Sequence, residues 1–142
     1  MIRNEPERGA VRRLLLQSDL PTDDLDSLDL RHFFACGEPE DPGGVVGLEM
    51  YESVALLRSL VVQPTQRGSG CGRALVEAAE RHARELGIRA IFLLTETAET
   101  FFEGCGYTAC EREVAPPDIR ATSQFSDLCP ASAAFMTKDL GA

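Results

Sequence analysis

Glycines at alternate positions, placed between an apolar run and a helix, constrain this chain more than any other feature. The apolar run Leu60–Val62 is followed by Pro64, and the loop Gly68-Ser69-Gly70-Cys71-Gly72 leads into a clear amphipathic helix. Glycine lets backbone N–H groups turn toward one point and leaves no Cβ in the way. The start of a helix adds unpaired N–H groups and the positive end of the helix dipole. We therefore expect this stretch to bind an anion, phosphate foremost.

The residues before the loop predict an antiparallel hairpin. Segments 45–51 and 54–62 have the composition of strands and are separated by only two residues. The second strand is almost wholly apolar, with Arg58 and Ser59 as its exceptions. Such a run is typical of a central strand that is covered on both faces.

The residues after the loop predict a crossover between parallel strands. A helix over 70–86 ends at Gly87, which suits the position after a helix C-terminus, and a buried strand follows over 88–95. We expect an α/β fold, with a mixed sheet and flanking helices, in a single domain over residues 1–142. Further helices are expected over 6–18, 98–105 and 117–122, and further strands over 2–3, 30–36, 107–110 and 133–138.

The net charge and the cysteine pattern limit which ligands and which cellular location we expect for this protein. The formal net charge of −9 disfavours nucleic acid and anionic membrane surfaces. No apolar run is long enough to span a bilayer and the N-terminus lacks a signal-peptide h-region, so we expect a cytoplasmic protein. The five cysteines form no C-x-x-C pair and the two histidines are isolated, so no metal site is expected. An odd cysteine count without secretion indicates reduced thiols.

Other phosphate-binding folds fit the glycines less well. A P-loop needs a Gly-Lys-Ser/Thr ending, and no lysine is near. A dinucleotide fold needs G-x-G-x-x-G after the strand and an acid about 20 residues further on. Glu96 does lie near the end of the next strand, so the requirement for an acidic residue does not by itself exclude a dinucleotide fold. The glycine spacing is different, however, and the preceding hairpin leaves no room for a second nucleotide-binding half.

Two ordered motifs resemble those of the GNAT family of N-acetyltransferases. Val62-x-Pro64-x-x-Arg67-x-x-Gly70-x-Gly72 is similar to that family's acetyl-CoA signature, R/Q-x-x-G-x-G/A. Ala98-x-x-Phe101-Phe102-x-x-x-Gly106-Tyr107 looks like its later motif, A-x-x-F-Y-x-x-x-G-F. Together with the strands before them, the motifs cover residues 45–112.

The resemblance implies a sheet that is splayed open between the strand ending at Val62 and the strand ending at Thr95. The pantetheine of acetyl-CoA would lie in that split, and the pyrophosphate would bind N–H groups of the glycine loop, in charge-assisted hydrogen bonds. The implied cofactor-binding residues are Leu60, Val61, Val62, Arg67, Gly68, Ser69, Gly70, Cys71, Gly72, Arg73 and Phe102.

A closer resemblance extends over the chain. Leu20-Pro21, residues 93–98, Ile119-Arg120-Ala121-Thr122 and residues 128–133 look like the small acetyltransferases of arsenical-resistance operons, specifically the second ArsN type. This resemblance implies an arsenic-detoxification context without identifying the acceptor, which we expect to be a small-molecule amine. Dimers are common in such folds, so a homodimer is a candidate assembly.

Catalysis is less well specified by the sequence than cofactor binding. The candidate bases for deprotonating an amine are Glu49, Glu52, Glu96 and Glu99. Of these we favour Glu49, on a strand bordering the acceptor cleft, and Glu96, at the end of a central parallel strand. Many family members place a tyrosine acid where this chain has Phe102, which cannot donate a proton. Direct attack in a ternary complex needs mainly proximity.

The acceptor site and two alternative functions stay open at this point. Thr95, Arg120 and Thr122 are candidate substrate-binding residues, and Thr97 is the expected cap of the helix that follows. Because the usual acid is missing, the alternative to an enzyme is a catalytically idle acyl-CoA sensor. A third function, an arsenical-binding thiol protein, would use Cys129.

Overall fold

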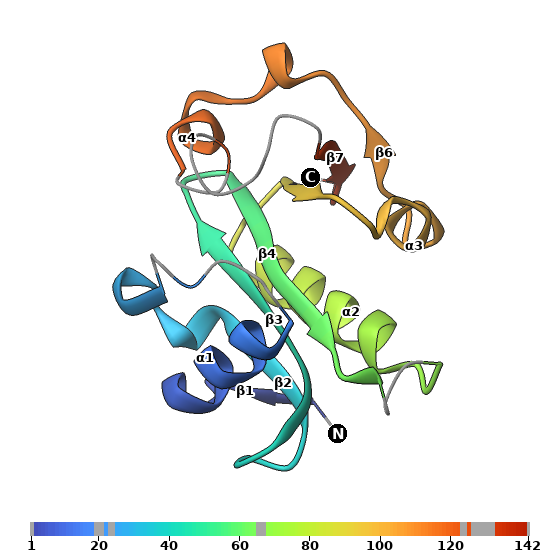
Figure 1. The fold of residues 1–142 in the computed structure, drawn as a ribbon. Helices are drawn as coiled ribbons and strands as arrows, with labels where there is room; N and C mark the ends of the chain where they lie inside the picture. The colour runs from blue at the N-terminus through green and yellow to red at the C-terminus, as the bar shows by residue number, and fades with distance from the viewer. Residues whose placement is uncertain are drawn as a thin grey trace.

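One seven-stranded sheet organises the protein (Figure 1). The computed structural model describes residues 2–18, 22, 25–64, 68–122, 125 and 133–141. The strands lie side by side in the order β1-β2-β3-β4-β5-β7-β6. Their bounds are β1 Ile2–Asn4, β2 Phe33–Gly37, β3 Pro42–Met50, β4 Val54–Val62, β5 Ala90–Thr95, β6 Thr108–Ala109 and β7 Ala134–Asp139. Among these described strands, only β4 and β5 pair in parallel, and β3 pairs with β4 antiparallel, which confirms the predicted parallel pair and the predicted hairpin.

The helices follow the expected apolar periodicity with small shifts at their ends. They are α1 Arg8–Gln17, α2 Cys71–Glu85, α3 Glu99–Gly104 and α4 Pro117–Arg120, with short 3-10 turns η1 Leu25–Ser27, η2 Leu30–His32 and η4 Arg112–Val114. Gly87, with φ of +86°, follows the C-cap of α2 as expected. One difference is at residues 30–32, which form η2 rather than the start of β2, because the Asp29 side chain accepts a hydrogen bond from the backbone N–H of Arg31. Among the described residues, no helix is long and apolar enough to cross a membrane.

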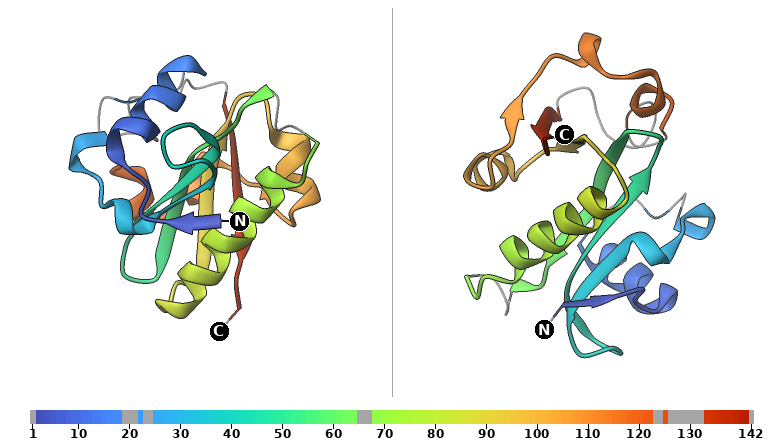
Figure 2. Two further views of the ribbon diagram at one scale, coloured as in Figure 1. Left: turned by 90° about the horizontal axis from the view of Figure 1, so that it is seen from below. Right: turned by 180° about the vertical axis from the view of Figure 1, so that it is seen from behind.

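Alternate residues of the central strands face two different helices. Phe34 and Val46 belong to an apolar cluster that includes residues of α2, whereas Phe33 and Val45 belong to a cluster that includes residues of α1. Side chains of a strand alternate between the two faces of the sheet, so α1 and α2 cover opposite faces, as Figure 2 shows. β4 is therefore buried from both sides, as its apolar composition predicts.

A disulfide corrects one expectation. We predicted reduced thiols, but Cys36 near the end of β2 is bonded to Cys71, the first residue of α2. The two residues are 35 positions apart in sequence, and the sheet and helix bring their Cα atoms to 6.7 Å. Cys105 and Cys110 are free.

Candidate active site

β4 and β5 pair only over their first residues. The parallel register runs from Val54 opposite Ala90 to Leu56 opposite Phe92, although both strands continue beyond it. The rest of β4 pairs with β3, ending with Val62 opposite Gly44, and the rest of β5 pairs with β7. Hence the sheet opens between the carboxyl ends of β4 and β5, as the resemblance implied.

A bulge marks the point where β4 turns away from β5. Val61 lies opposite Val45 and Arg58 lies opposite Gly47, so β4 has one more residue than β3 between these pairs. Ser59 has a φ of +61°, a left-handed conformation that is uncommon for a residue other than glycine. Bulges of this kind bend a strand and redirect its backbone groups.

A cavity of about 700 Å³ lies beside the end of β4 and the start of α2. It collects the predicted cofactor-binding residues Leu60, Val61, Val62, Gly68, Gly70, Gly72 and Arg73. Ser18, Thr97, Ala98 and Phe101 also line it. The predicted strand and glycine loop thus form one site.

The glycines of the loop are needed for two different reasons. Gly68 and Gly70 have φ of +83° and +88°, and no described residue lies within 4 Å of the place a Cβ would occupy, so conformation rather than space requires glycine there. Gly72 lies inside α2, where a Cβ would come within 3.3 Å of the Phe101 ring. Gly70 is the N-cap of α2 and offers no side-chain cap, so the first N–H groups of the helix are left to other acceptors. These features fit a coenzyme A pyrophosphate.

Three of the predicted cofactor-binding residues do not line the cavity. The Cys71 side chain is turned away into the disulfide, and Ser69 does not line the cavity. Arg67 lies outside the described residues. Phe102 is 3% exposed and packs in the core against Tyr107, whereas its neighbour Phe101 lines the cavity. Phe102 is thus a core residue, because α3 turns its side chain toward the α2 cluster.

Arg73 keeps its place at the cavity while bridging two helices. Its Nη2 donates a hydrogen bond of 3.2 Å to the carbonyl oxygen of Gly104, the last residue of α3. The exposed guanidinium therefore ties the glycine loop to α3 and adds positive charge beside the cavity.

Glu49, one candidate base, belongs to a partly buried hydrogen-bonded group. Its Oε2 accepts a hydrogen bond of 2.9 Å from Arg58, and its Oε1 accepts one of 2.8 Å from the Tyr51 hydroxyl. The Nε of Arg58 also donates to the Ser59 hydroxyl at 3.0 Å, beside the bulge. Burial, reinforced by the hydrogen bond to Glu49, raises the pKa of Tyr51. Both carboxylate oxygens of Glu49 thus already have a donor, which is the arrangement of a structural ion pair.

Glu96, the other candidate base, is exposed just beyond β5. Thr95, at the end of β5, accepts a hydrogen bond of 3.0 Å from the backbone N–H of Ala98. Our prediction that Thr97 caps this helix is therefore wrong: it is Thr95 that bonds to Ala98, the N-cap residue, and Thr97 lines the cavity instead. Because Thr95 is already a hydrogen-bond acceptor here, it fixes the segment that closes one side of the cavity.

Arg120 and Thr122, the other candidate substrate residues, hold the end of α4 together. Arg120 donates to the carbonyl oxygens of Glu113 at 2.8 Å and Ala115 at 3.3 Å. Thr122 is 4% exposed, and its hydroxyl donates to the carbonyl oxygen of Ile119. Like Thr95, neither residue lines the cavity.

Some cavity residues carried little or no sequence signal. Ala98 and Phe101 belong to the second motif, whose spacing was visible. Ser18, at the C-terminus of α1, lies far from both motifs in sequence and reaches the cavity only through the packing of α1 on the sheet. Among the described residues, no cluster of three or more His, Cys, Asp or Glu side chains is placed to hold a metal ion.

Known proteins are similar to this chain in sequence. An uncharacterized N-acetyltransferase of Chlorobaculum tepidum is 35% identical over 91 residues, which are 63% of this chain and 58% of that protein. An amino-acid acetyltransferase of Serratia proteamaculans is 31% identical over 70 residues, which are 49% of this chain and 16% of that protein. The chain thus spans less than two thirds of the length of each of these relatives.

A solved structure has the same fold along nearly the whole chain. Rv2747 from Mycobacterium tuberculosis, in complex with CoA and NLQ, superposes with a TM-score of 0.77 and 21% identity over 98% of each chain. At that identity the likeness shows the fold alone. The sequence profile of the Acetyltransferase (GNAT) family matches residues 5–107, which contain both motifs and the hairpin. The chain therefore belongs to the GNAT family of acetyltransferases.

Proposed function

We propose that this protein is an acetyl-CoA-dependent N-acetyltransferase that acetylates the amine of a small molecule. The observation that carries this proposal is the single cavity lined by both the diverging end of β4 and the glycine loop at the start of α2. Membership of the GNAT family and the N-acetyltransferase and amino-acid acetyltransferase names of the relatives support it.

Two parts of the cavity would bind two different parts of acetyl-CoA. Gly68, Gly70 and the first turn of α2 offer backbone N–H groups and the positive end of the helix dipole to the pyrophosphate. Leu60, Val61 and Val62 offer strand backbone and apolar side chains to the pantetheine. Acetyl-CoA would supply the acetyl group as a thioester.

Transfer to an amine requires the amine to be neutral when it attacks. Glu49 and Glu96 are the candidate acceptors of its proton, with Glu49 held rigidly by Arg58 and Tyr51 and Glu96 free to approach from the surface. Phe102 has no proton to give and is buried, so the thiolate leaves through water or another donor. We propose direct transfer in a ternary complex, in which proximity supplies most of the rate.

The proposal also extends to the chemical class of the acceptor amine. The relative from Serratia is named an amino-acid acetyltransferase, which supports an amino-acid amine. The resemblance to the second ArsN type supports an amine used in arsenic resistance, with Thr95, Arg120 and Thr122 on the acceptor side. A cytoplasmic location and a homodimer complete this proposal.

The test is to incubate the protein with acetyl-CoA and a panel of amines, amino acids and amino-acid arsenicals included, and to detect acetylated products by mass spectrometry. We expect one class of amine to be acetylated. Glu49→Gln and Glu96→Gln are compared with wild type, and replacement of the base should lower kcat by about a hundredfold or more while acetyl-CoA binding is unchanged. Tight acetyl-CoA binding with no product from any amine would favour the idle acyl-CoA sensor, which the loss of the usual tyrosine at Phe102 keeps as a second candidate.

A further inference from the structure

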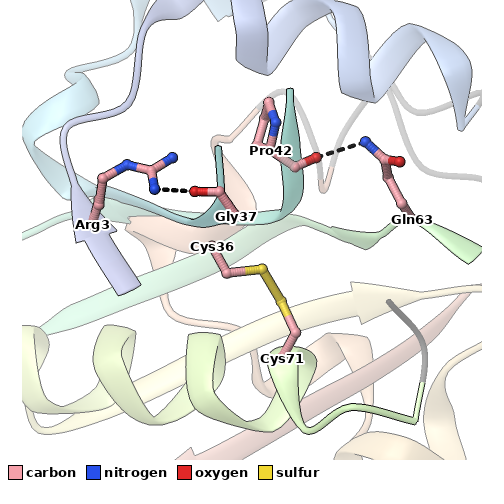
Figure 3. The surroundings of a disulfide bond; sticks show 6 residues. All are labelled: Arg3, Cys36, Gly37, Pro42, Gln63 and Cys71. Carbon is pink, nitrogen blue, oxygen red and sulfur yellow. Dashed lines mark hydrogen bonds between the residues drawn. A yellow bond between two sulfur atoms is a disulfide. The ribbon is translucent and has the colours of Figure 1, made fainter. Parts of the chain in front are cut away.

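The Cys36–Cys71 disulfide links the glycine loop to the end of β2. Figure 3 shows the bond running from the end of β2 to the first turn of α2. Cys71 stands between Gly70 and Gly72, both of which line the cavity, but its sulfur points the other way, toward the sheet. A Cβ added to Gly44 of β3 would come within 3.0 Å of that sulfur. The bond therefore anchors the loop from the side opposite the cavity and takes up no cavity space.

The β2 end of this anchor is fixed by the sheet. Cys36 is 7% exposed and packs in the core, and the Arg3 guanidinium donates to the carbonyl oxygen of the next residue, Gly37. The Gln63 side chain, at the end of β4, donates to the carbonyl oxygen of Pro42 at 2.7 Å (Figure 3). Cys36 thus belongs to a tightly hydrogen-bonded corner of the sheet.

The α2 end has fewer neighbours. Among the described residues, none has an atom within 4 Å of the would-be Cβ positions of Gly68 and Gly70. Two residues in left-handed conformations must nevertheless keep their N–H groups directed at one point. Ordering a residue's backbone has a cost in conformational entropy. The disulfide ties Cys71, which follows Gly70, to the rigid corner of the sheet at Cys36. It thereby lowers the entropic cost of ordering the loop when a ligand binds.

The two cysteines have complementary chemical roles. Cys71 is half-buried and is the first residue of a 15-residue helix, where the helix dipole favours a thiolate. Cys36 is buried. In the reduced protein the Cys71 thiolate would attack a low-molecular-weight disulfide, forming a mixed disulfide and releasing one thiol. The Cys36 thiolate then attacks the Cys71 sulfur and releases the second thiol. Two electrons pass from the protein to the small disulfide, and the two protons leave on the released thiols.

We propose that Cys36 and Cys71 form a reversible thiol–disulfide site and that closing it raises the affinity of the cavity for coenzyme A. The affinity part rests on the proposed function, because that function makes coenzyme A the ligand. The disulfide form already holds the start of α2 in the geometry that binds coenzyme A. In the dithiol form, the start of α2 must become ordered when coenzyme A binds. A low-molecular-weight thiol and disulfide couple sets which form is present.

The test compares acetyl-CoA affinity in the two states by titration calorimetry, after oxidation with a glutathione disulfide couple and after reduction with a phosphine. We expect reduction to weaken binding about tenfold, which corresponds to about 1.4 kcal/mol. Peptide mapping of each sample identifies the bond. Equal affinity in the two states, or failure of glutathione disulfide to close the bond, would overturn the proposal. Absence of binding in both states would instead overturn the proposed function together with the affinity claim.

A thermodynamic cycle supplies a second, independent readout. If the disulfide raises acetyl-CoA affinity about tenfold, saturating acetyl-CoA must shift the thiol–disulfide equilibrium toward the disulfide by the same factor. Acetyl-CoA is the suitable ligand because its own sulfur is acylated and takes no part in exchange. An equilibrium that acetyl-CoA leaves unmoved contradicts the proposal.

The informative variant is Cys36→Ser, because Cys36 lies away from the cavity. It should bind acetyl-CoA as weakly as the reduced wild type and should not respond to the phosphine. Cys36→Ala serves the same purpose if the serine variant fails to fold, as judged by circular dichroism. Cys105→Ser and Cys110→Ser are matched controls, since both thiols are free, and they should keep the response to reduction. A Cys36 variant that retains the oxidised wild-type affinity would also overturn the proposal.

Discussion

The Arg58 guanidinium donates a hydrogen bond of 2.9 Å to the Glu49 carboxylate, and the Arg58 side chain is completely excluded from solvent. Glu49 keeps 12% of its side-chain surface exposed. The pair spans the β3–β4 hairpin beside the bulge, where Gly47 opposite Arg58 has no side chain of its own. A candidate base and the bulge are thus held by one buried cation.

Replacing Arg58 by methionine should destabilise the fold by about 3 kcal/mol, because the mostly buried Glu49 carboxylate loses its cation. The free energy of unfolding in urea measures this. The double variant Arg58→Met/Glu49→Leu is the control, and it should recover a large part of the loss because no unpaired charge remains. If the double variant is as unstable as the single one, the ion pair is not the cause.

Gly70→Asp should weaken acetyl-CoA binding by about a hundredfold, since a negative charge would face the pyrophosphate. Gly70→Asn is the matched control. Asparagine tolerates the left-handed conformation at this position and has nearly the same shape without the charge. Calorimetric titration of both variants separates charge from strain. Similar affinities of the aspartate and asparagine variants would contradict an anion site at Gly70.

Breaking the disulfide should lower the free energy of unfolding by about 4 kcal/mol, because the bond closes a loop between residues 35 positions apart. Urea unfolding of the oxidised wild type, the reduced wild type and Cys36→Ser provides the comparison. The last two should agree with each other. A reduced wild type as stable as the oxidised protein would show that the bond adds nothing to stability.

Tyr107→Phe should leave the stability unchanged or raise it by about 1 kcal/mol. The Tyr107 hydroxyl is buried and has no hydrogen-bond partner in the described part of the chain, so its removal relieves a desolvated polar group. Burial, with Glu80 nearby, raises the pKa of this phenol, which keeps it protonated and unsuited to donate a proton to a thiolate. Thermal unfolding and kcat are the measurements, and a kcat loss of tenfold or more would assign Tyr107 a catalytic role.

The His32–His82 contact should make stability fall as the pH drops below neutrality. His32 Nδ1 and His82 Nε2 are 2.9 Å apart, and burial, followed by the charge of His32, lowers the pKa of His82 below 6.5, with Glu85 opposing. The unfolded state then binds a proton more readily than the folded state. The contribution of His82 is complete above the unfolded pKa and disappears as the pH falls through the folded pKa.

Urea unfolding from about pH 7.5 to about pH 5.5 checks this prediction. His82→Gln should give a flatter profile over that range, because glutamine keeps a polar side chain without a titrating proton. Asp29, 3.9 Å from His32, is already ionised throughout this range and should not alter the slope. A His82→Gln profile as steep as that of wild type would assign the slope to other groups.

Local pattern was enough to predict the hairpin, the long helix and the glycine loop, because each depends on neighbours in sequence. The choice between Phe101 and Phe102 was not predictable in this way. Consecutive residues of a helix point about 100° apart, so which ring faces the cavity depends on how α3 is rolled against α2. Thr95 and Thr97 differ for a similar reason, since the turn before α3 decides which of them bonds to Ala98 and which lines the cavity.

The other features of the site could not be predicted from local sequence, because they depend on contacts between segments that are distant in the chain. Cys36 and Cys71 are isolated cysteines in the sequence, and only the packing of α2 on β2 brings them together. Arg58 was visible as a charge in an apolar strand, but its partner Glu49 depends on a register shifted by the bulge. Ser18 reaches the cavity from a helix that neither motif includes.

The disulfide also makes part of the chain a covalent macrocycle. The bond between Cys36 and Cys71 encloses β3, β4 and the glycine loop, which together contain the hairpin and one wall of the cavity. A single proteolytic cut at the exposed Glu52 or Ser53 of the hairpin turn would therefore release no fragment until a reductant opened the bond. A nicked chain would keep both halves of the hairpin tethered in place.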